Sequence, residues 1–171
     1  MNDFAALYQR YSLDVYRFAL SLSGNAAEAE DIASETFARA WLVPTELRLG
    51  TVKAYLLTIA RNLFLKGLRR EARHVELNVR LTDPAPGPAA RAEHRAELAA
   101  VLKALQRLPE VDRAALLMRA EQGMSYDEIA AALGLSLTAV KVKIHRARLR
   151  LATSRTSDHE ASDAHHARSD H

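Results

Sequence analysis

The chain has 171 residues, 49% of them hydrophobic, with a formal net charge of +3 and no Cys. This length allows one ordinary domain or two small ones. The lack of Cys excludes a disulfide framework and a thiolate metal site, and no apolar run approaches the roughly 20 residues that a membrane span needs. Because the first ten residues also lack the pattern of a signal peptide, we expect a soluble, cytoplasmic protein without membrane insertion.

Helical periodicity dominates the first part of the chain. Apolar residues at intervals of three and four predict one helix face made of Phe4, Leu7, Tyr11, Val15, Phe18 and Leu22. A capping-box pattern, Asn25 with Glu28, starts a second helix with an inner face of Ile32, Ala33, Phe37 and Ala40. A third helix is predicted over 52–73, with an inner face of Leu56, Ile59, Ala60, Leu63 and Leu68. No stretch alternates as a strand would.

A change of composition then divides the chain. The segment TDPAPGPAA at 82–90 contains three Pro, which lack the N–H donor that a helix interior needs. We therefore predict an all-α fold with two small helical domains, 1–73 and 93–152, joined by a flexible, Pro-rich linker at 74–92. Residues 153–171 are polar and almost free of large apolar side chains, so we predict a disordered tail.

The second domain is predicted to contain a helix-turn-helix. A first helix carries Leu98, Val101, Leu102, Leu105 and Leu108 and ends at Pro109, and a second covers 111–122. The Ser125 and Glu128 capping box starts a short helix that ends at Gly134, and Ser136 can cap the last helix. This arrangement of helix, tight turn and helix is typical of DNA-binding domains.

The last predicted helix has an apolar stripe between two cationic flanks. The stripe is Leu137, Val140, Ile144, Ala147 and Leu151. Advancing about 100° per residue places Lys141 and Arg148 on one flank, and Lys143, Arg146 and Arg150 on the other. Thr138, Val142 and His145 point away from the stripe. Such a helix suits the major groove of DNA, where the flanks meet phosphates and the outward residues meet base edges. Arg146 is the residue that we expect to read guanine if it turns inward.

Three stretches of the chain resemble bacterial sigma factors of the extracytoplasmic-function group. The stretch from LPEVDRAALL to VKVKIHRARLRL, 108–151, resembles region 4. EAEDIASETFARAW, 28–41, resembles region 2.2, and AYLLTIARNLFLKGLRRE, 54–71, resembles region 2.4. Four positions depart from the usual family pattern, in which Gln, Trp, Asp and often Ser stand where this chain has Ser34, Tyr55, Lys66 and Val142.

The resemblance implies three sets of site residues. It implies that core RNA polymerase, through its β′ and β subunits, is a partner, and that β′ docks on Asp31, Glu35, Phe37, Arg39 and Trp41. It implies that the melted −10 element of promoter DNA contacts the loop at 44–52 together with Tyr55, Arg61, Asn62, Lys66, Arg69 and Arg70. It implies that the duplex −35 element contacts Thr138, Lys141, Val142, Lys143, His145, Arg146 and Arg148. By analogy, an anti-sigma factor is a further partner.

Several alternatives remain open from the residues alone. The acidic helix at 25–41 is also explained as a solvated face with Phe37 and Trp41 in the core, and Tyr55 as a packing residue. A stand-alone helix-turn-helix regulator explains 98–151 but gives the acidic helix no purpose. Weak metal binding by the tail, with His159, His165, His166 and His171, is a third interpretation. We predict no cofactor, no metal site and no enzymatic activity, since no catalytic constellation rises above chance.

Overall fold

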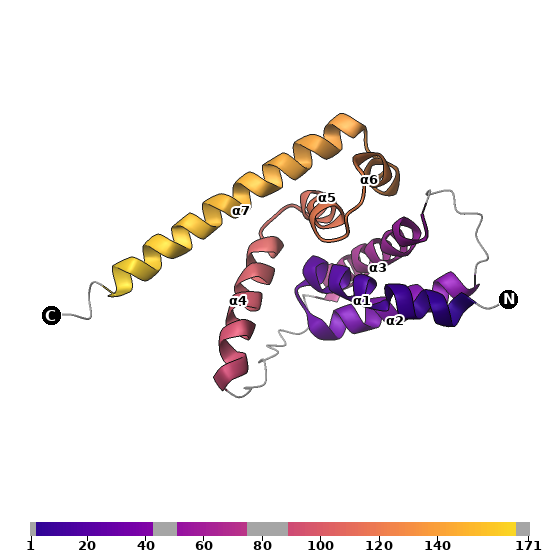
Figure 1. Ribbon diagram of the computed structural model, residues 1–171, viewed down its shortest axis with the longest axis horizontal. Coiled ribbons are helices and arrows are strands. Elements are labelled where there is room, and N and C mark those ends of the chain that lie inside the picture. The colour runs from indigo at the N-terminus through magenta and orange to yellow at the C-terminus, as the bar shows by residue number, and fades with distance from the viewer. Residues whose placement is uncertain (1–2, 43–50, 75–88, 167–171) are drawn as a thin grey trace.

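The computed structural model describes residues 3–42, 51–74 and 89–166, and these residues form helices and turns without a strand (Figure 1). The helices are α1 Asp3–Ser23, α2 Ala26–Leu42, α3 Val52–His74, α4 Ala89–Gln106, α5 Glu110–Ala120, α6 Tyr126–Leu133 and α7 Leu137–His166. The predicted all-α fold is therefore confirmed. None of the helices in these ranges combines the length and apolar character that a membrane crossing requires.

The helices α1, α2 and α3 pack on one another as a bundle. On α1 the predicted residues Val15, Phe18 and Leu22 are buried, together with Ala19. The turn before α2 contains Gly24 at φ +69°, and Asn25 Oδ1 accepts the backbone N–H of Glu28 at 3.0 Å. This bond satisfies one of the N–H groups that a helix start leaves without an intrahelical partner.

The buried face of α3 differs in part from the predicted face. Leu56 and Ala60 are buried as expected, but Leu68 is exposed, so its predicted inward position was wrong. The side chains that complete the buried face are Ala54, Leu57 and Phe64. Leu68 belongs neither to the buried cluster nor to the side chains packed against it, whereas Leu63 and Leu65 pack against the cluster.

The predicted caps of the C-terminal helices are present. Ser125 Oγ accepts the N–H of Glu128 at 3.1 Å at the start of α6, and Ser136 Oγ accepts the N–H of Ala139 at 3.1 Å at the start of α7. Between these helices Gly134 adopts φ 65°, ψ 37°, the left-handed cap that Gly supplies without a Cβ clash. The sequence signals therefore placed both starts and the turn correctly.

Only the C-terminal end of α4 is packed into the core. Leu105 in its last turn and Leu108 just after its end are buried, whereas Leu98 and Val101 are about half exposed, in contrast to the single apolar face that their spacing predicts. Figure 1 shows why, because the earlier turns of α4 extend away from α1 and α5. The helix is amphipathic in sequence, but the fold covers its stripe at one end.

The two helical units pack against each other. The buried apolar residues form one cluster that includes Phe18 and Leu57 from the first unit and Leu117 and Ile129 from the second. Helix α1 contacts α4 and α5, and α3 contacts α6. The composition around the predicted linker indicates two domains joined by a flexible segment. The structure adds that the two helical units are packed against each other.

Helix α7 continues through Thr153 and Ser157 to His166. The composition of 153–171 predicts no ordered structure, yet the backbone is helical over most of this range. The physical reason is that extending an existing helix requires no new nucleus, so each residue adds a hydrogen bond. The hydroxyls of Thr153 and Ser157 bond to carbonyls four residues earlier, at 3.0 and 3.2 Å.

Candidate nucleic-acid and protein interfaces

Helix α7 presents its predicted outward residues to solvent. Thr138, Val142 and His145 are all exposed, while Val140 and Ile144 are buried against α5 and α6. The predicted register is therefore confirmed from Val140 to Leu151, whereas Leu137, at the first position of the helix, is 39% exposed and its predicted place in the apolar stripe was wrong. An exposed strip of a polar, an apolar and an imidazole side chain, anchored from behind by a rigid core, can approach base edges in a groove.

Two cations of α7 share one buried carboxylate. Asp112, in the first turn of α5, accepts from Arg146 Nε at 2.8 Å and from Arg146 Nη2 at 3.0 Å, and Lys143 Nζ lies 3.6 Å from Oδ1. The Asp112 side chain is 1% exposed. The hydrogen bonds from Arg146 hold the pKa of Asp112 below its ordinary value, against the effect of burial. Sequence reasoning missed Asp112, which lies 34 positions from Arg146.

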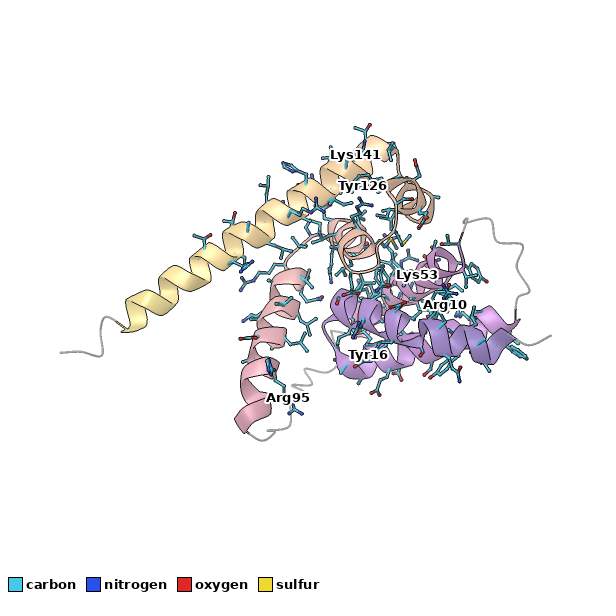
Figure 2. All side chains as sticks on the ribbon, in the orientation of Figure 1. Arg10, Tyr16, Lys53, Arg95, Tyr126 and Lys141 are labelled. Atoms are coloured by element: carbon cyan, nitrogen blue, oxygen red, sulfur yellow. The ribbon has the colours of Figure 1, made fainter. Side chains whose placement is uncertain are left out.

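On the other flank, two cations contact one aromatic ring. The guanidinium carbon of Arg119 lies 4.4 Å from the ring centroid of Tyr126, and Lys141 Nζ lies 5.7 Å from it. Figure 2 shows Tyr126 on α6 beside Lys141 on α7. Cations over an aromatic face are attracted by its quadrupole, by about 0.5–1 kcal/mol at exposed sites. Lys141 is therefore held near the start of the exposed strip.

The basic face of α3 is mostly open. Asn62, Lys66, Arg69 and Arg70 are exposed, as a nucleic-acid contact requires. Arg61 differs, because it forms a bidentate ion pair with Glu110 of α5. Tyr55 is partly buried. Of the predicted −10 loop at 44–52, residues 44–50 lie outside the described residues.

The acidic helix α2 places its predicted docking residues in two different environments. Asp31, Glu35 and Arg39 are exposed, and Arg39 Nε donates to Glu35 Oε1 at 3.0 Å. Trp41 is 66% exposed, but Phe37 is only 2% exposed. Phe37 therefore supports this surface from below and does not reach its outside.

Phe37 belongs to an aromatic cluster with Phe4, Tyr8 and Trp41. The ring centroid of Phe37 lies 5.0 Å from that of Tyr8 and 6.4 Å from that of Phe4, and Phe4 lies 5.0 Å from Trp41. These are edge-on contacts, the arrangement that aromatic quadrupoles favour. The cluster fixes the end of α2 against α1 and leaves Trp41 outermost.

An open groove joins the acidic residues of α2 to the basic residues of α3. Its volume is about 730 Å³, and its lining includes Asp31, Glu35, Lys66 and Arg70. The fold thus brings together residues that the sequence analysis assigned to two different partners. Between the same two helices, burial raises the pKa of Glu28 on α2, and the nearby charges of Glu71 and Asp31 raise it further.

No group of three side chains suited to hold a metal ion occurs among the described residues. The four His residues of the tail, His159, His165, His166 and His171, lie outside the described side chains. The metal-binding interpretation of the tail therefore stays untested.

Two family models match the chain in sequence. Sigma-70 region 2 matches residues 7–74, and sigma-70 region 4 matches residues 98–151. The first match ends where α3 ends, and the second begins within α4 and ends within α7. Together they span both helical units.

Three curated relatives carry sigma factor names. The ECF RNA polymerase sigma factor SigE of Mycolicibacterium smegmatis is 37% identical over 88% of this chain and 61% of its own length, so the chain spans less than two thirds of that relative. EcfG of Rhodopseudomonas palustris is 36% identical over 79% of this chain and 75% of its own length. SigM of Bacillus subtilis is 32% identical over 85% of this chain and 90% of its own length.

Two solved structures share the fold over most of the chain. The sigma factor RpoE of Bartonella quintana, in complex with the anti-sigma factor NepR, matches with a TM-score of 0.77 and 30% identity over 92% of this chain and 99% of its own. CnrH, in complex with the cytosolic domain of CnrY, matches with a TM-score of 0.70 and 28% identity over 91% of this chain and 88% of its own.

Proposed function

The chain belongs to the ECF RNA polymerase sigma factors, and from that membership we propose that it binds core RNA polymerase and directs it to promoters. The observation that carries the proposal is the order of the two units, because one chain holds both a region 2 and a region 4. A stand-alone helix-turn-helix regulator requires only the second. The chain supplies binding free energy and no catalytic group, and it works in the cytoplasm beside polymerase.

The two units divide the work in this proposal. Residues 1–73 form the region 2 domain, 93–152 form the region 4 domain, and 74–92 link them. The −10 and −35 elements are about 25 base pairs apart, on the order of 85 Å of duplex at 3.4 Å per base pair. Two small domains reach both elements at once only when they are separated, so the docked arrangement must open.

Region 2 has surfaces for two partners. The exposed carboxylates Asp31 and Glu35, with Trp41 beyond them, fit a basic protein surface such as one on the β′ subunit, because an acidic helix repels DNA. Lys66, Arg69 and Arg70 form a cationic face that fits the backbone of a melted −10 strand. Phe37 supports the first surface, and Tyr55 remains a candidate for stacking.

Region 4 reads the −35 duplex with α7. Lys141, Lys143 and Arg148 contact phosphates, whereas Thr138, Val142, His145 and Arg146 lie where base edges come within reach. Phosphate contacts make binding fall steeply with salt. Core polymerase adds further contacts through its β subunit.

The docked arrangement is also the form that fits an anti-sigma factor. Both solved relatives were captured in complexes, RpoE with NepR and CnrH with the cytosolic domain of CnrY, and this chain superimposes on each over most of its length. We propose that a protein of this kind holds the two units together and that its removal lets them separate.

Run-off transcription with purified core polymerase tests the proposed function. The expected result is specific initiation by the wild-type chain. Asp31→Lys should abolish it by placing a cation on the docking surface, while Glu97→Lys is the matched control, an exposed acid on α4 away from that surface. Binding of a duplex operator by the chain alone, with no effect on polymerase, would contradict the proposal and support the regulator.

A further inference from the structure

Asp112 lies between α5 and α7, with both carboxylate oxygens engaged by the DNA-facing helix. Its Oδ2 accepts from Arg146 Nε and its Oδ1 from Arg146 Nη2, while Lys143 Nζ approaches Oδ1 at 3.6 Å. A bidentate Arg–carboxylate pair fixes the plane of the guanidinium as well as its position. Arg146 therefore has a defined orientation before any DNA arrives.

The pairing leaves a specific part of Arg146 unused. A guanidinium has five N–H groups, and within the described part of the chain two of them bond to Asp112. The edge formed by Nε and Nη2 is occupied, so the edge formed by Nη1 and the second proton of Nη2 remains. The Arg146 side chain is 45% exposed and lies on the cationic flank, next in sequence to His145 of the outward strip. An exposed pair of parallel donors matches the O6 and N7 acceptors of guanine.

Packing alone does not explain a carboxylate at this position. Burying a charge is unfavourable unless it is paired, and an apolar side chain of similar size would hold α5 against α7 without that penalty. What an apolar residue cannot do is orient the guanidinium. Arg148 and Arg150 provide the contrast, because both are exposed and neither has a side-chain hydrogen bond to the rest of the described chain. Unrestrained cations of that kind suit phosphates, which accept from many directions.

We propose that Asp112 is a positioning residue for promoter readout, which holds Arg146 so that its free edge donates to O6 and N7 of one guanine in the −35 duplex. Lys143, whose Nζ lies 3.6 Å from Oδ1, adds a second positive charge beside the carboxylate. This inference rests on the proposed function, since it assigns the base that the region 4 helix selects. It also assigns Asp112 as the residue that orients Arg146 for this selection.

Transcription from a promoter library with a randomised −35 element tests the inference. The protein is the full chain with core polymerase, and the variants are Asp112→Asn, Arg146→Lys and the double variant. Wild type should favour guanine at one position by about 5- to 150-fold, the discrimination expected of one bidentate contact. Asp112→Asn and Arg146→Lys should each remove most of this preference at the same position. The double variant should lose little more of the preference, because both changes disrupt the same Asp112–Arg146 pair.

Asp127→Asn is the control, since Asp127 is an exposed acid in the first turn of α6. It should leave the preference unchanged. Thermal melting of each variant separates lost readout from lost folding, and Arg146→Lys keeps the inference testable if Asp112→Asn unfolds, because the Arg146 side chain lies near the surface. The inference is overturned if wild type favours no guanine, or if Asp112→Asn lowers transcription equally for all bases.

Failure of the proposed function gives a different pattern. If wild type fails to initiate transcription, the same library of duplexes is bound to the full chain alone at low salt. A guanine preference that Asp112→Asn removes would then support the role of Asp112 without a sigma function. A guanine preference that persists in Asp112→Asn would overturn the positioning role of Asp112.

Discussion

Arg61 of α3 and Glu110 of α5 form a bidentate ion pair across the junction of the two helical units. Arg61 Nε donates to Glu110 Oε1 at 2.7 Å, and Arg61 Nη2 donates to Oε2 at 2.9 Å. Both side chains are only about 15% exposed. A residue proposed to bind the −10 strand is thus occupied by the domain proposed to bind the −35 duplex, so docking of the units and capture of the strand compete.

Removing the carboxylate should therefore weaken docking and free Arg61. Glu110→Gln leaves Arg61 partly buried without its counter-charge, so the free energy of unfolding should fall by about 1–3 kcal/mol. Affinity for a single-stranded −10 oligonucleotide should rise. Urea unfolding followed by circular dichroism and fluorescence anisotropy of the oligonucleotide measure the two effects. Glu97→Gln, at an exposed position of α4, should change neither. Unchanged oligonucleotide affinity in Glu110→Gln would contradict the competition.

Asp112 should make stability depend on pH in the acid range. Its pKa in the folded chain lies below its ordinary value of 3.8, mainly because of the hydrogen bonds from Arg146. The stabilisation is therefore complete above pH 3.8 and is lost as the pH falls through the folded-state pKa. Asp112→Asn should lower the free energy of unfolding by about 1–3 kcal/mol at pH 7. The difference in the free energy of unfolding between wild type and variant should become smaller below pH 3.8. Urea unfolding at a series of pH values checks this, and a gap independent of pH would refute it.

Glu28 should show the opposite pH dependence. Burial raises its pKa above the ordinary value of 4.5, and the charges of Glu71 and Asp31 add to the effect. The folded chain then binds the proton more tightly than the unfolded chain, so stability falls as the pH rises above 4.5. Glu28→Gln should gain stability relative to wild type between pH 4.5 and 7. Glu30→Gln, at a neighbouring exposed position, is the control, and a constant difference between Glu28→Gln and wild type would show that the pKa is not raised.

Two glycines should respond to alanine with opposite signs. Gly134 has φ +65° at the turn between α6 and α7, so Gly134→Ala should cost about 1–2 kcal/mol although no atom lies within 4 Å of the new Cβ. Gly67 lies inside α3, and its nearest neighbour would be Glu28 Oε1 at an ordinary contact distance of 3.6 Å. Gly67→Ala should stabilise by about 0.5–1 kcal/mol. Thermal unfolding of both variants measures the signs, and stabilisation by Gly134→Ala would disprove the strain argument.

Local features of the fold followed directly from the sequence. The caps at Asn25, Ser125 and Ser136 and the left-handed turn at Gly134 act within one helical turn, so neighbouring residues are enough to predict them. The outward register of Thr138, Val142 and His145 followed from helical periodicity for the same reason. The order of the sigma-like blocks also needed only the linear sequence.

The tertiary structure decided which residues meet across helices. Asp112 pairs with a residue 34 positions away and Arg61 with one 49 positions away. The exposure of Leu68 and of Leu98 likewise depends on which helix lies beside each side chain and where that helix ends. Periodicity tells which side of a helix is apolar, but the angle and position at which two helices cross come from the packing of all their side chains together. Docking of the two units therefore became visible only when the helices were placed in three dimensions.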